Sequence, residues 1–266
     1  MENEVRLENE FLLGTMIWSF SRLNSYYNCP YEWQQHYLLC NKGAESSFGQ
    51  FGSFCHKCLE LFANGDLDVF SISQFYEDNY ADEVTLPFPP NKHVDIGQSY
   101  YEKGLDYFNN ISLNIEDYEV LGVEKEVRFK VENYDMIGYI DLLLKNKKTG
   151  EITILDHKSA SIKILKNGNI SKTDMAHFEE FKHQLYLYSK AVIEEYGRVD
   201  YLEWNLFKDQ NNYRIPWKEE EYSKSISWAI DTIHKIEKET EWAPNPDFYY
   251  CRYLCGQRTN GCPYKP

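Results

Sequence analysis

The stretch MIGYIDLLLKNKKTGEITILDHK, residues 136–158, decides the fold. It contains two apolar runs, near 135–144 and 151–157, and a lysine-rich turn over 146–150 between them. Runs of this length that are rich in Ile and Leu are typical of buried strands, and the turn has the Asn and Gly that a hairpin needs. The sequence therefore predicts a β-hairpin whose strands are both buried.

Each predicted strand carries an acid, Asp141 in the first and Asp156 in the second, and Lys158 follows two residues after Asp156. Residues two apart on a strand face the same side, so Asp156 and Lys158 should point together. Two buried carboxylates are costly unless a cation compensates them, and a hard divalent ion with oxygen ligands would do so. Such a site can act on a phosphodiester. The alternative is a structural ion pair beside a solvated aspartate.

Three further side chains are candidates for the same site. His56 lies on a predicted helix near 50–64, where a histidine can equally be a core residue. Gln184 and Tyr188 are four residues apart on a predicted helix near 178–196, so they share one face. A phosphate or a metal-bound water would give this polar pair partners, and ordinary amphipathic packing is the alternative.

Four short motifs then occur in order along the chain, behind an opening motif over residues 19–33. They are Gly52-x-x-x-His56, Gly138-x-x-Asp141, Asp156-x-Lys158 and Gln184-x-x-x-Tyr188. This series resembles the RecB-type branch of the PD-(D/E)XK nuclease superfamily. Ile140 stands where the superfamily name has Pro, as is usual in that branch.

The resemblance implies an α/β fold of the restriction-endonuclease type, with a mixed central sheet flanked by helices, an N-terminal helical region and a C-terminal cysteine cluster. It implies a Mg²⁺ or Mn²⁺ site and assigns Lys158 as the catalytic lysine, with Gln184 and Tyr188 supporting the site or the substrate. The metal ligands that it implies are His56, Asp141, Asp156 and the main-chain carbonyl of His157.

The seven cysteines give a second signal. An odd number, without a signal peptide, argues against a disulfide framework. Cys251, Cys255 and Cys262 lie close together near the C-terminus, and soft thiolates at such spacing suit zinc or an iron–sulfur cluster. A fourth ligand is needed, and either Cys29 or Cys40 can provide it. The remaining pair, Cys55 and Cys58, reads as buried small hydrophobic residues.

One upstream cysteine and three at the C-terminus resemble the iron–sulfur subset of RecB-type nucleases, to which AddB nuclease domains and CRISPR-associated adaptation nucleases belong. This resemblance implies a [4Fe–4S] cluster that joins the two chain ends through Cys29, Cys251, Cys255 and Cys262. The interval from Cys251 to Cys255 has three intervening residues, whereas two are commonest in that subset. A four-cysteine zinc site is the chemical alternative.

The net charge of −14 does not exclude DNA as a partner, because local potential is not fixed by global charge. Residues 145–172 contain seven lysines and two acids, and Lys163 and Lys166 in this segment are candidates to follow a phosphate backbone. A solvated lysine-rich loop is the alternative. The candidates to contact single-stranded DNA are Arg22, Tyr26, Tyr27 and Trp33, since bases stack on aromatic rings; packing is their alternative role.

The 266 residues are expected to form one elaborated nuclease domain: a helical region over 1–115, a nuclease core over 116–240 and a cluster-binding tail over 241–266. The pattern predicts helices near 21–27 (capped by Ser21), 30–39, 50–64, 71–81, 94–111, 178–196 and 219–238, and strands near 118–130, 135–144, 151–157, 200–208 and 212–216. No apolar run of about 18 residues and no secretory segment occur, which predicts a cytoplasmic protein of a bacterial, archaeal or phage-infected cell.

These features together predict a metal-dependent DNA nuclease with a structural iron–sulfur cluster, most simply an exonuclease on DNA ends or single strands. A helicase or a recombination or adaptation protein is the expected protein partner. The alternative is a non-catalytic nucleic-acid-binding subunit of a recombination or CRISPR adaptation complex.

Overall fold

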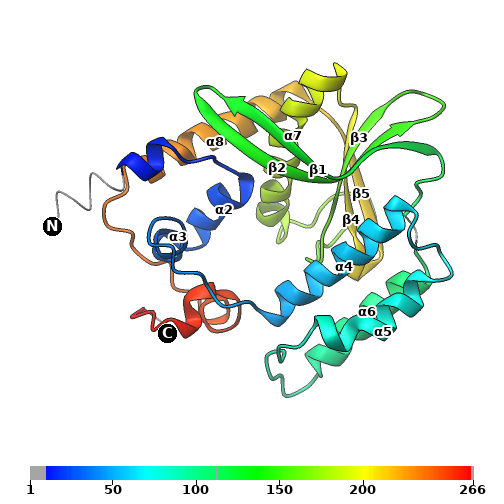
Figure 1. The fold of residues 1–266 in the computed structure, drawn as a ribbon, viewed down its shortest axis with the longest axis horizontal. Helices are drawn as coiled ribbons and strands as arrows, with labels where there is room; N and C mark the ends of the chain where they lie inside the picture. Colours follow the sequence, from blue (N-terminus) through cyan, green and yellow to red (C-terminus); the bar gives the residue numbers. More distant parts are fainter. Residues whose placement is uncertain (1–9, 112, 265–266) are drawn as a thin grey trace. The chain divides into compact units, whose positions relative to one another are not determined.

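The computed structural model describes residues 10–111 and 113–264 (Figure 1). A run of helices precedes three consecutive strands, and a helix, two strands and a further helix follow. They are α2 (Phe20–Asn28), α3 (Pro30–Tyr37), α4 (Ser47–Asn64), α5 (Ile72–Glu83), α6 (Ile96–Asn109), β1 (Tyr118–Val131), β2 (Tyr134–Asn146), β3 (Ile152–His157), α7 (Met175–Tyr196), β4 (Tyr201–Leu206), β5 (Asn211–Pro216) and α8 (Glu219–Glu237), with short helical turns η1 (Phe207–Asp209), η2 (Tyr250–Leu254) and η3 (Gly256–Thr259). Among the described residues, no helix is both long and apolar enough to cross a membrane.

The chain folds into two compact units. Unit 1 contains Met1–Ser46, Arg128–Gly138 and Ser223–Pro266, and unit 2 contains Ser47–Val127 and Tyr139–Tyr222. Unit 1 thus combines residues from both ends of the chain, whereas unit 2 is nearly continuous in sequence. The organisation as one nuclease domain in three segments stays a prediction.

A five-stranded mixed sheet, in the order β1-β2-β3-β4-β5, organises the fold. Strands β2 and β3 are antiparallel, β3 and β4 are parallel, and β4 and β5 are antiparallel. The turn between β2 and β3 has the predicted chemistry, because the Asn146 side chain accepts hydrogen bonds from two turn amides and Gly150 adopts a φ of +72°. The predicted buried hairpin and the restriction-endonuclease-like mixed α/β fold are confirmed.

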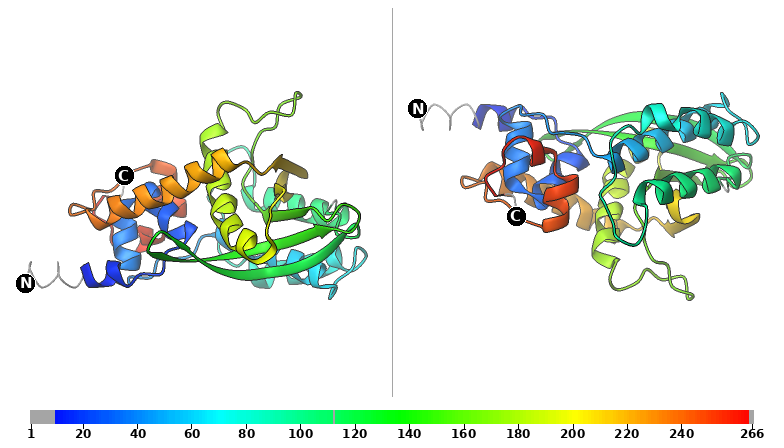
Figure 2. Two further views of the ribbon diagram at one scale, coloured as in Figure 1. Left: turned by 90° about the horizontal axis from the view of Figure 1, so that it is seen from above. Right: turned by 90° about the horizontal axis from the view of Figure 1, so that it is seen from below.

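In unit 2, helices cover both faces of the sheet: α4, α5 and α6 lie on one face and α7 on the other (Figure 2). The core under α4 contains Phe51 and Phe54 from the helix, and Leu142, Leu144 and Leu155 from the sheet, all of them buried. Side chains alternate between the faces of a strand, so the intervening residues of β2 and β3 face the α7 side. This alternation sends Asp156 toward α7.

Unit 1 is built around stacked tryptophans. Trp33 on α3 is fully buried, and its ring stacks on Trp18 (centroids 6.3 Å apart) and on Trp242 (5.3 Å). The α2 helix begins earlier than expected, because Ser19 rather than Ser21 is its N-cap and accepts a hydrogen bond from the Arg22 amide. Ser21 lies inside the helix, so the prediction of a Ser21 cap was wrong.

Candidate active site and a cysteine-lined pocket

The two acids of the hairpin lie side by side, Asp141 in the middle of β2 and Asp156 near the end of β3. Asp141 is 8% exposed and Asp156 is 3% exposed. The Asp141 carboxylate accepts a hydrogen bond from the His157 amide at 2.6 Å, so the backbone of β3 holds it in place. Burial raises the pKa of Asp141 well above its usual range, and the Asp156 charge raises this pKa further. Two buried acids that repel each other are a site where a cation is strongly favoured.

Lys158 lies directly beside Asp156, as the strand periodicity predicts. Its Nζ donates to Asp156 Oδ1 at 3.1 Å and lies 2.8 Å from Oδ2 as an ion pair. The same ammonium donates to Gln184 Oε1 at 2.8 Å, and Gln184 Nε2 donates to Asp156 Oδ1 at 3.0 Å. Gln184 on α7 therefore hydrogen-bonds to both members of the Asp156–Lys158 pair and fixes the orientation of the ammonium.

Tyr188 completes this side of the site. It lies one helical turn after Gln184 on α7, is buried, and hydrogen-bonds with the Gln184 side chain. Burial and the charges of Asp156 and Asp141 raise the pKa of Tyr188, so its hydroxyl stays protonated near neutral pH. The structure brings Gln184 and Tyr188 to the predicted acids.

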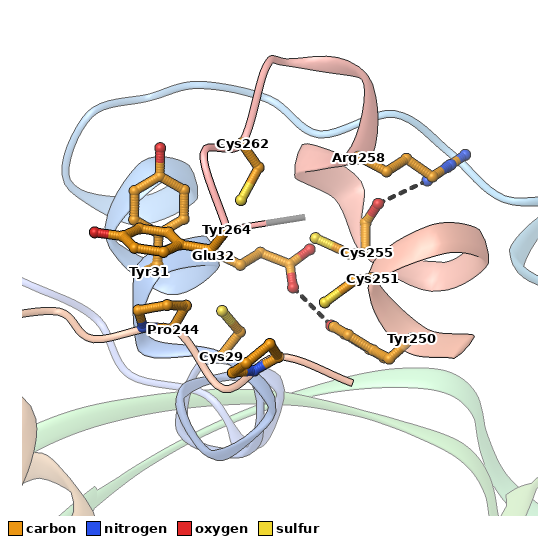
Figure 3. Close-up of a pocket in the computed structure, with 11 residues that line it drawn as sticks. Cys29, Tyr31, Glu32, Pro244, Tyr250, Cys251, Cys255, Arg258, Cys262 and Tyr264 are labelled. Atoms are coloured by element: carbon orange, nitrogen blue, oxygen red, sulfur yellow. Dashed lines mark hydrogen bonds between the residues drawn. The ribbon is translucent and has the colours of Figure 1, made fainter. Parts of the chain in front are cut away.

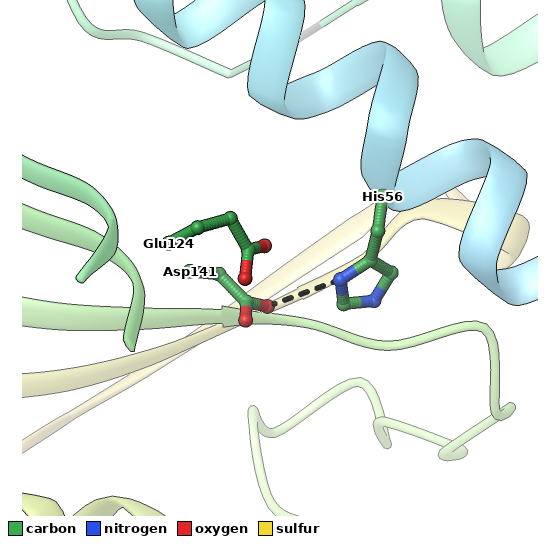
Figure 4. Close-up of side chains that lie close together, drawn as sticks. All are labelled: His56, Glu124 and Asp141. Carbon is green, nitrogen blue, oxygen red and sulfur yellow. Dashed lines mark ion pairs between the residues drawn. The ribbon is translucent and has the colours of Figure 1, made fainter. Parts of the chain in front are cut away.

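His56 approaches the acids from α4. Its Nδ1 lies 3.5 Å from Asp141 Oδ2 (Figure 4), and its ring hydrogen-bonds to the His157 main chain. Burial lowers the pKa of His56, which favours the neutral imidazole that metals bind. His56 is therefore placed with the acids rather than alone in the core.

Glu124 on β1 is a site residue that the sequence analysis missed. One carboxylate oxygen of Glu124, one of Asp141 and one ring nitrogen of His56 lie within 4.8 Å of one another (Figure 4). Burial raises the pKa of Glu124, and the charges of Glu60 and Asp156 add to this effect. Glu124 adopts a φ of +46°, which is uncommon for a non-glycine residue and is typical of functional positions.

The donor set fits a hard divalent cation. Carboxylate oxygens with one imidazole suit Mg²⁺ or Mn²⁺. Asp156 Oδ2 is buried, and its partner in the described part of the chain is the Lys158 ammonium, 2.8 Å away. The predicted ligands His56, Asp141 and Asp156 meet here, with the His157 main chain beside His56.

A second group of candidate ligands lies in unit 1, in a pocket lined by four cysteines (Figure 3). They are Cys29, Cys251, Cys255 and Cys262, the set that sequence resemblance implies. Cys40, the other candidate for fourth ligand, is exposed and does not line this pocket. Cys55 and Cys58 are buried in the core of unit 2, as expected.

The C-terminal cysteines are presented by a helical turn. Cys251 lies in the π-helical turn η2, and Cys255 directly follows it. The turn closes with a hydrogen bond from the Cys255 amide to the Tyr250 carbonyl at 2.8 Å. This turn accommodates the three residues between the two cysteines and leaves both thiols at the pocket. Burial, and next the neighbouring Glu32 carboxylate, raise the pKa of Cys255 to about 12.

The candidate DNA contacts differ in their environments. Lys163 and Lys166 are exposed on the loop between β3 and α7 in unit 2. Arg22 in unit 1 lies 5.3 Å from the Tyr37 ring centroid and donates to a main-chain carbonyl, while the Tyr26 hydroxyl donates to Glu239 at 2.8 Å. Arg22 and Tyr26 thus make contacts within unit 1, and their role in DNA binding stays a prediction.

Trp33 cannot stack on a base in this structure, because its ring is enclosed by Trp18, Trp242 and Tyr26. The hypothesis that Trp33 is a stacking platform is therefore wrong, and the packing alternative holds.

The chain belongs to the PD-(D/E)XK nuclease superfamily, whose sequence model matches residues 17–266. It is also similar to a crystal structure from Eubacterium rectale that carries the name "putative exonuclease". That likeness covers 91% of this chain and 88% of the other, with a TM-score of 0.53 and 12% identity, and at this identity it shows the fold alone. No curated protein matches the chain. Superfamily membership makes the protein a nuclease of a type that uses divalent metals.

Proposed function

We propose that this protein is a Mg²⁺- or Mn²⁺-dependent DNA nuclease whose active site is the Asp141, Asp156 and Lys158 cluster. The observation that carries the proposal is the pair of buried, mutually repelling carboxylates with a lysine held against one of them. Such a pair is unfavourable by itself and becomes favourable around a cation. His56 and Glu124 supply the remaining side-chain donors.

Each residue has a distinct role in this proposal. A bound divalent ion would polarise the scissile phosphate and lower the pKa of a water. Asp141, Asp156, His56, Glu124 and the His157 carbonyl would hold it. Lys158, oriented by Gln184, places a positive charge where negative charge develops on the phosphate or orients the attacking water. Tyr188 supports Gln184 through a hydrogen bond, and its raised pKa keeps its own hydroxyl protonated.

DNA ends or single strands are the proposed substrate, and cleavage is proposed to be exonucleolytic. The exposed Lys163 and Lys166, on a loop that follows the catalytic strand directly, would contact the phosphate backbone. The name of the similar Eubacterium rectale structure agrees with exonuclease activity. A helicase or recombination protein would supply such ends, and co-purification tests that part of the proposal.

We also propose that the four cysteines of unit 1 hold a [4Fe–4S] cluster. Four thiols that line one pocket supply the number of ligands that such a cluster takes, and the upstream and C-terminal cysteines that the resemblance implies are the ones that line it. Free thiols of this kind persist in a reducing compartment such as cytoplasm.

The deciding experiment uses protein purified without oxygen and end-labelled single- and double-stranded DNA. We expect cleavage with Mn²⁺ or Mg²⁺ and none with EDTA, a brown colour, and about four irons per chain. Product lengths separate removal of terminal nucleotides from internal cutting. Metal-independent cleavage, or binding without cleavage under all conditions, would overturn the nuclease proposal. One zinc per colourless chain would overturn the cluster and leave the nuclease intact.

A further inference from the structure

A carboxylate lies among the four cysteines of unit 1. Glu32 on α3 lines the same pocket as Cys29, Cys251, Cys255 and Cys262, and Figure 3 shows its carboxylate pointing between the thiols. Its Oε2 accepts a hydrogen bond from the Tyr250 hydroxyl at 2.7 Å, and its Oε1 accepts one from the Gly256 amide at 2.6 Å. Metal–thiolate sites do not need such a group for coordination, so its presence calls for a role.

Glu32 also accepts a hydrogen bond from the Cys255 thiol, and this bond would be lost when the thiolate binds a cluster. The hydrogen bonds from the Tyr250 hydroxyl and the Gly256 amide come from groups that are not cluster ligands, so both would persist and hold the carboxylate in place. The Cys255 sulfur has a main-chain donor of its own, the Gln257 amide. Glu32 therefore adds a carboxylate to the pocket, directly beside a proposed ligand.

A carboxylate at this place acts on the electron affinity of a cluster. The reduction potential of an iron–sulfur cluster depends on net charge around it. A [4Fe–4S]²⁺ core with four thiolates carries a charge of −2, and the gain of one electron, with no proton, makes it −3. A negative carboxylate held nearby opposes that gain.

We propose that Glu32 lowers the reduction potential of the cluster and so keeps it in the oxidised [4Fe–4S]²⁺ state. This inference rests on the proposed cluster and assigns Glu32 as a tuning residue rather than a ligand. The cluster then serves to hold the two chain ends together and does not exchange electrons with cellular reductants. The reduced state is disfavoured by a charge built into α3.

The test is a redox titration of Glu32→Gln, which keeps the shape of the side chain and removes its charge. Anaerobic protein is titrated with dithionite as electron donor, and the reduced cluster is followed by electron paramagnetic resonance. At a fixed potential we expect the ratio of reduced to oxidised cluster to rise roughly tenfold, equivalent to about 59 mV for one electron. Glu241→Gln, an exposed carboxylate in the same unit, should leave the potential unchanged.

Tyr250→Phe gives a second readout of the opposite sign. It removes one donor from Glu32 but keeps the charge, so the potential should fall or stay equal. An unchanged potential in Glu32→Gln with a full complement of iron would overturn the role of Glu32 and leave the cluster standing. Glu32→Gln gives no reading if it assembles no cluster. In that case, a raised reduction potential in Tyr250→Phe would overturn the proposed role of Glu32. Absence of iron from the unmodified protein would instead overturn the cluster itself.

Discussion

The carboxylate site of unit 2 and the cysteine pocket of unit 1 are assembled in opposite ways. The first takes oxygen donors from paired strands and one imidazole from α4, and its central acids are 15 residues apart across one hairpin. The second takes sulfur donors from α3's start and from the C-terminal turns, which only the tertiary fold brings together. Oxygen ligands on a sheet suit a catalytic divalent metal. Thiolate ligands that are far apart in the sequence suit a structural role, because metal binding then joins distant parts of the chain.

The largest effect should come from the catalytic pair. Asp156→Ala and Lys158→Ala should each lower the cleavage rate by at least ~10²-fold, because each removes a charge that acts on the scissile phosphate. Single-turnover cleavage of end-labelled DNA measures this. Asp66→Ala and Lys148→Ala, exposed residues of the same unit, are the matched controls. Iron content should stay normal in all four variants, and iron loss from Asp156→Ala would break the separation of the two sites.

The converse experiment removes the upstream cysteine. Cys29→Ala should lose the iron and lower the Tm by at least about 5 °C, because metal binding across a closure of roughly 220 residues contributes to folding free energy. Iron analysis and thermal unfolding measure the two effects. Cys40→Ala is the control, since that thiol is exposed and away from the pocket. Equal iron loss from both variants would show that Cys29 has no special place.

Glu124→Gln tests whether Glu124 is a ligand of the metal at the carboxylate site. Loss of one oxygen ligand's charge should weaken Mn²⁺ binding by roughly tenfold, comparable with measured effects of residues around metal sites. Calorimetry on cluster-containing protein measures the affinity, with Glu116→Gln as an exposed control on the same unit. If affinity is unchanged while His56→Ala weakens it, Glu124 lies near the metal without binding it.

Asp141→Asn should stabilise the metal-free protein by a few degrees while it abolishes cleavage. The pKa of Asp141 is higher in the folded state than in the unfolded state. At pH values between these two pKa values folding takes up a proton, so the stability of the folded state falls as the pH rises through this interval. Asparagine keeps the acceptor for the His157 amide and removes this cost. Thermal unfolding with EDTA at several pH values tests it. A lower Tm for Asp141→Asn at neutral pH would contradict the proposed repulsion between buried acids.

The smallest effect concerns DNA contacts. Lys163→Ala combined with Lys166→Ala should weaken the salt dependence of single-strand binding. The slope of log binding constant against log salt concentration should become less negative by about 0.7 for each phosphate contact that is lost. Binding is measured at several salt concentrations with a cleavage-inactive background, and Lys92→Ala, exposed elsewhere in unit 2, is the control. An unchanged slope would make the lysine loop an ordinary solvated segment.

Periodicity was sufficient for most of the fold. The hairpin, its Asn–Gly turn and the placement of Asp156 beside Lys158 follow from the two-residue repeat of strands, which local sequence displays directly. The long helices were likewise predicted to within a few residues. Such features depend on residues that are near one another in the sequence, so the periodicity of the sequence is sufficient to predict them.

Glu124 and Trp33 show why the remainder could not be predicted. Glu124 reaches the site through a positive φ within a strand, and no alternation pattern indicates that conformation. Gly122 two residues earlier is the one available signal, because glycine inside a strand often marks a bulge. The burial of Trp33 depends on Trp242, over 200 residues away, so its role as a packed residue rather than a DNA contact is a property of the tertiary fold.

The composition of unit 1 from both chain ends has a consequence for biosynthesis. Roughly 220 residues separate Cys29 from Cys251, and a ribosome that adds 5–20 residues per second needs roughly 10 to 45 seconds to make them. During that interval α2 and α3 have emerged without the segment that covers them, while the residues of unit 2 are completed. The nuclease sheet can therefore form before the chain ends close around their thiols, so the proposed cluster would be inserted last.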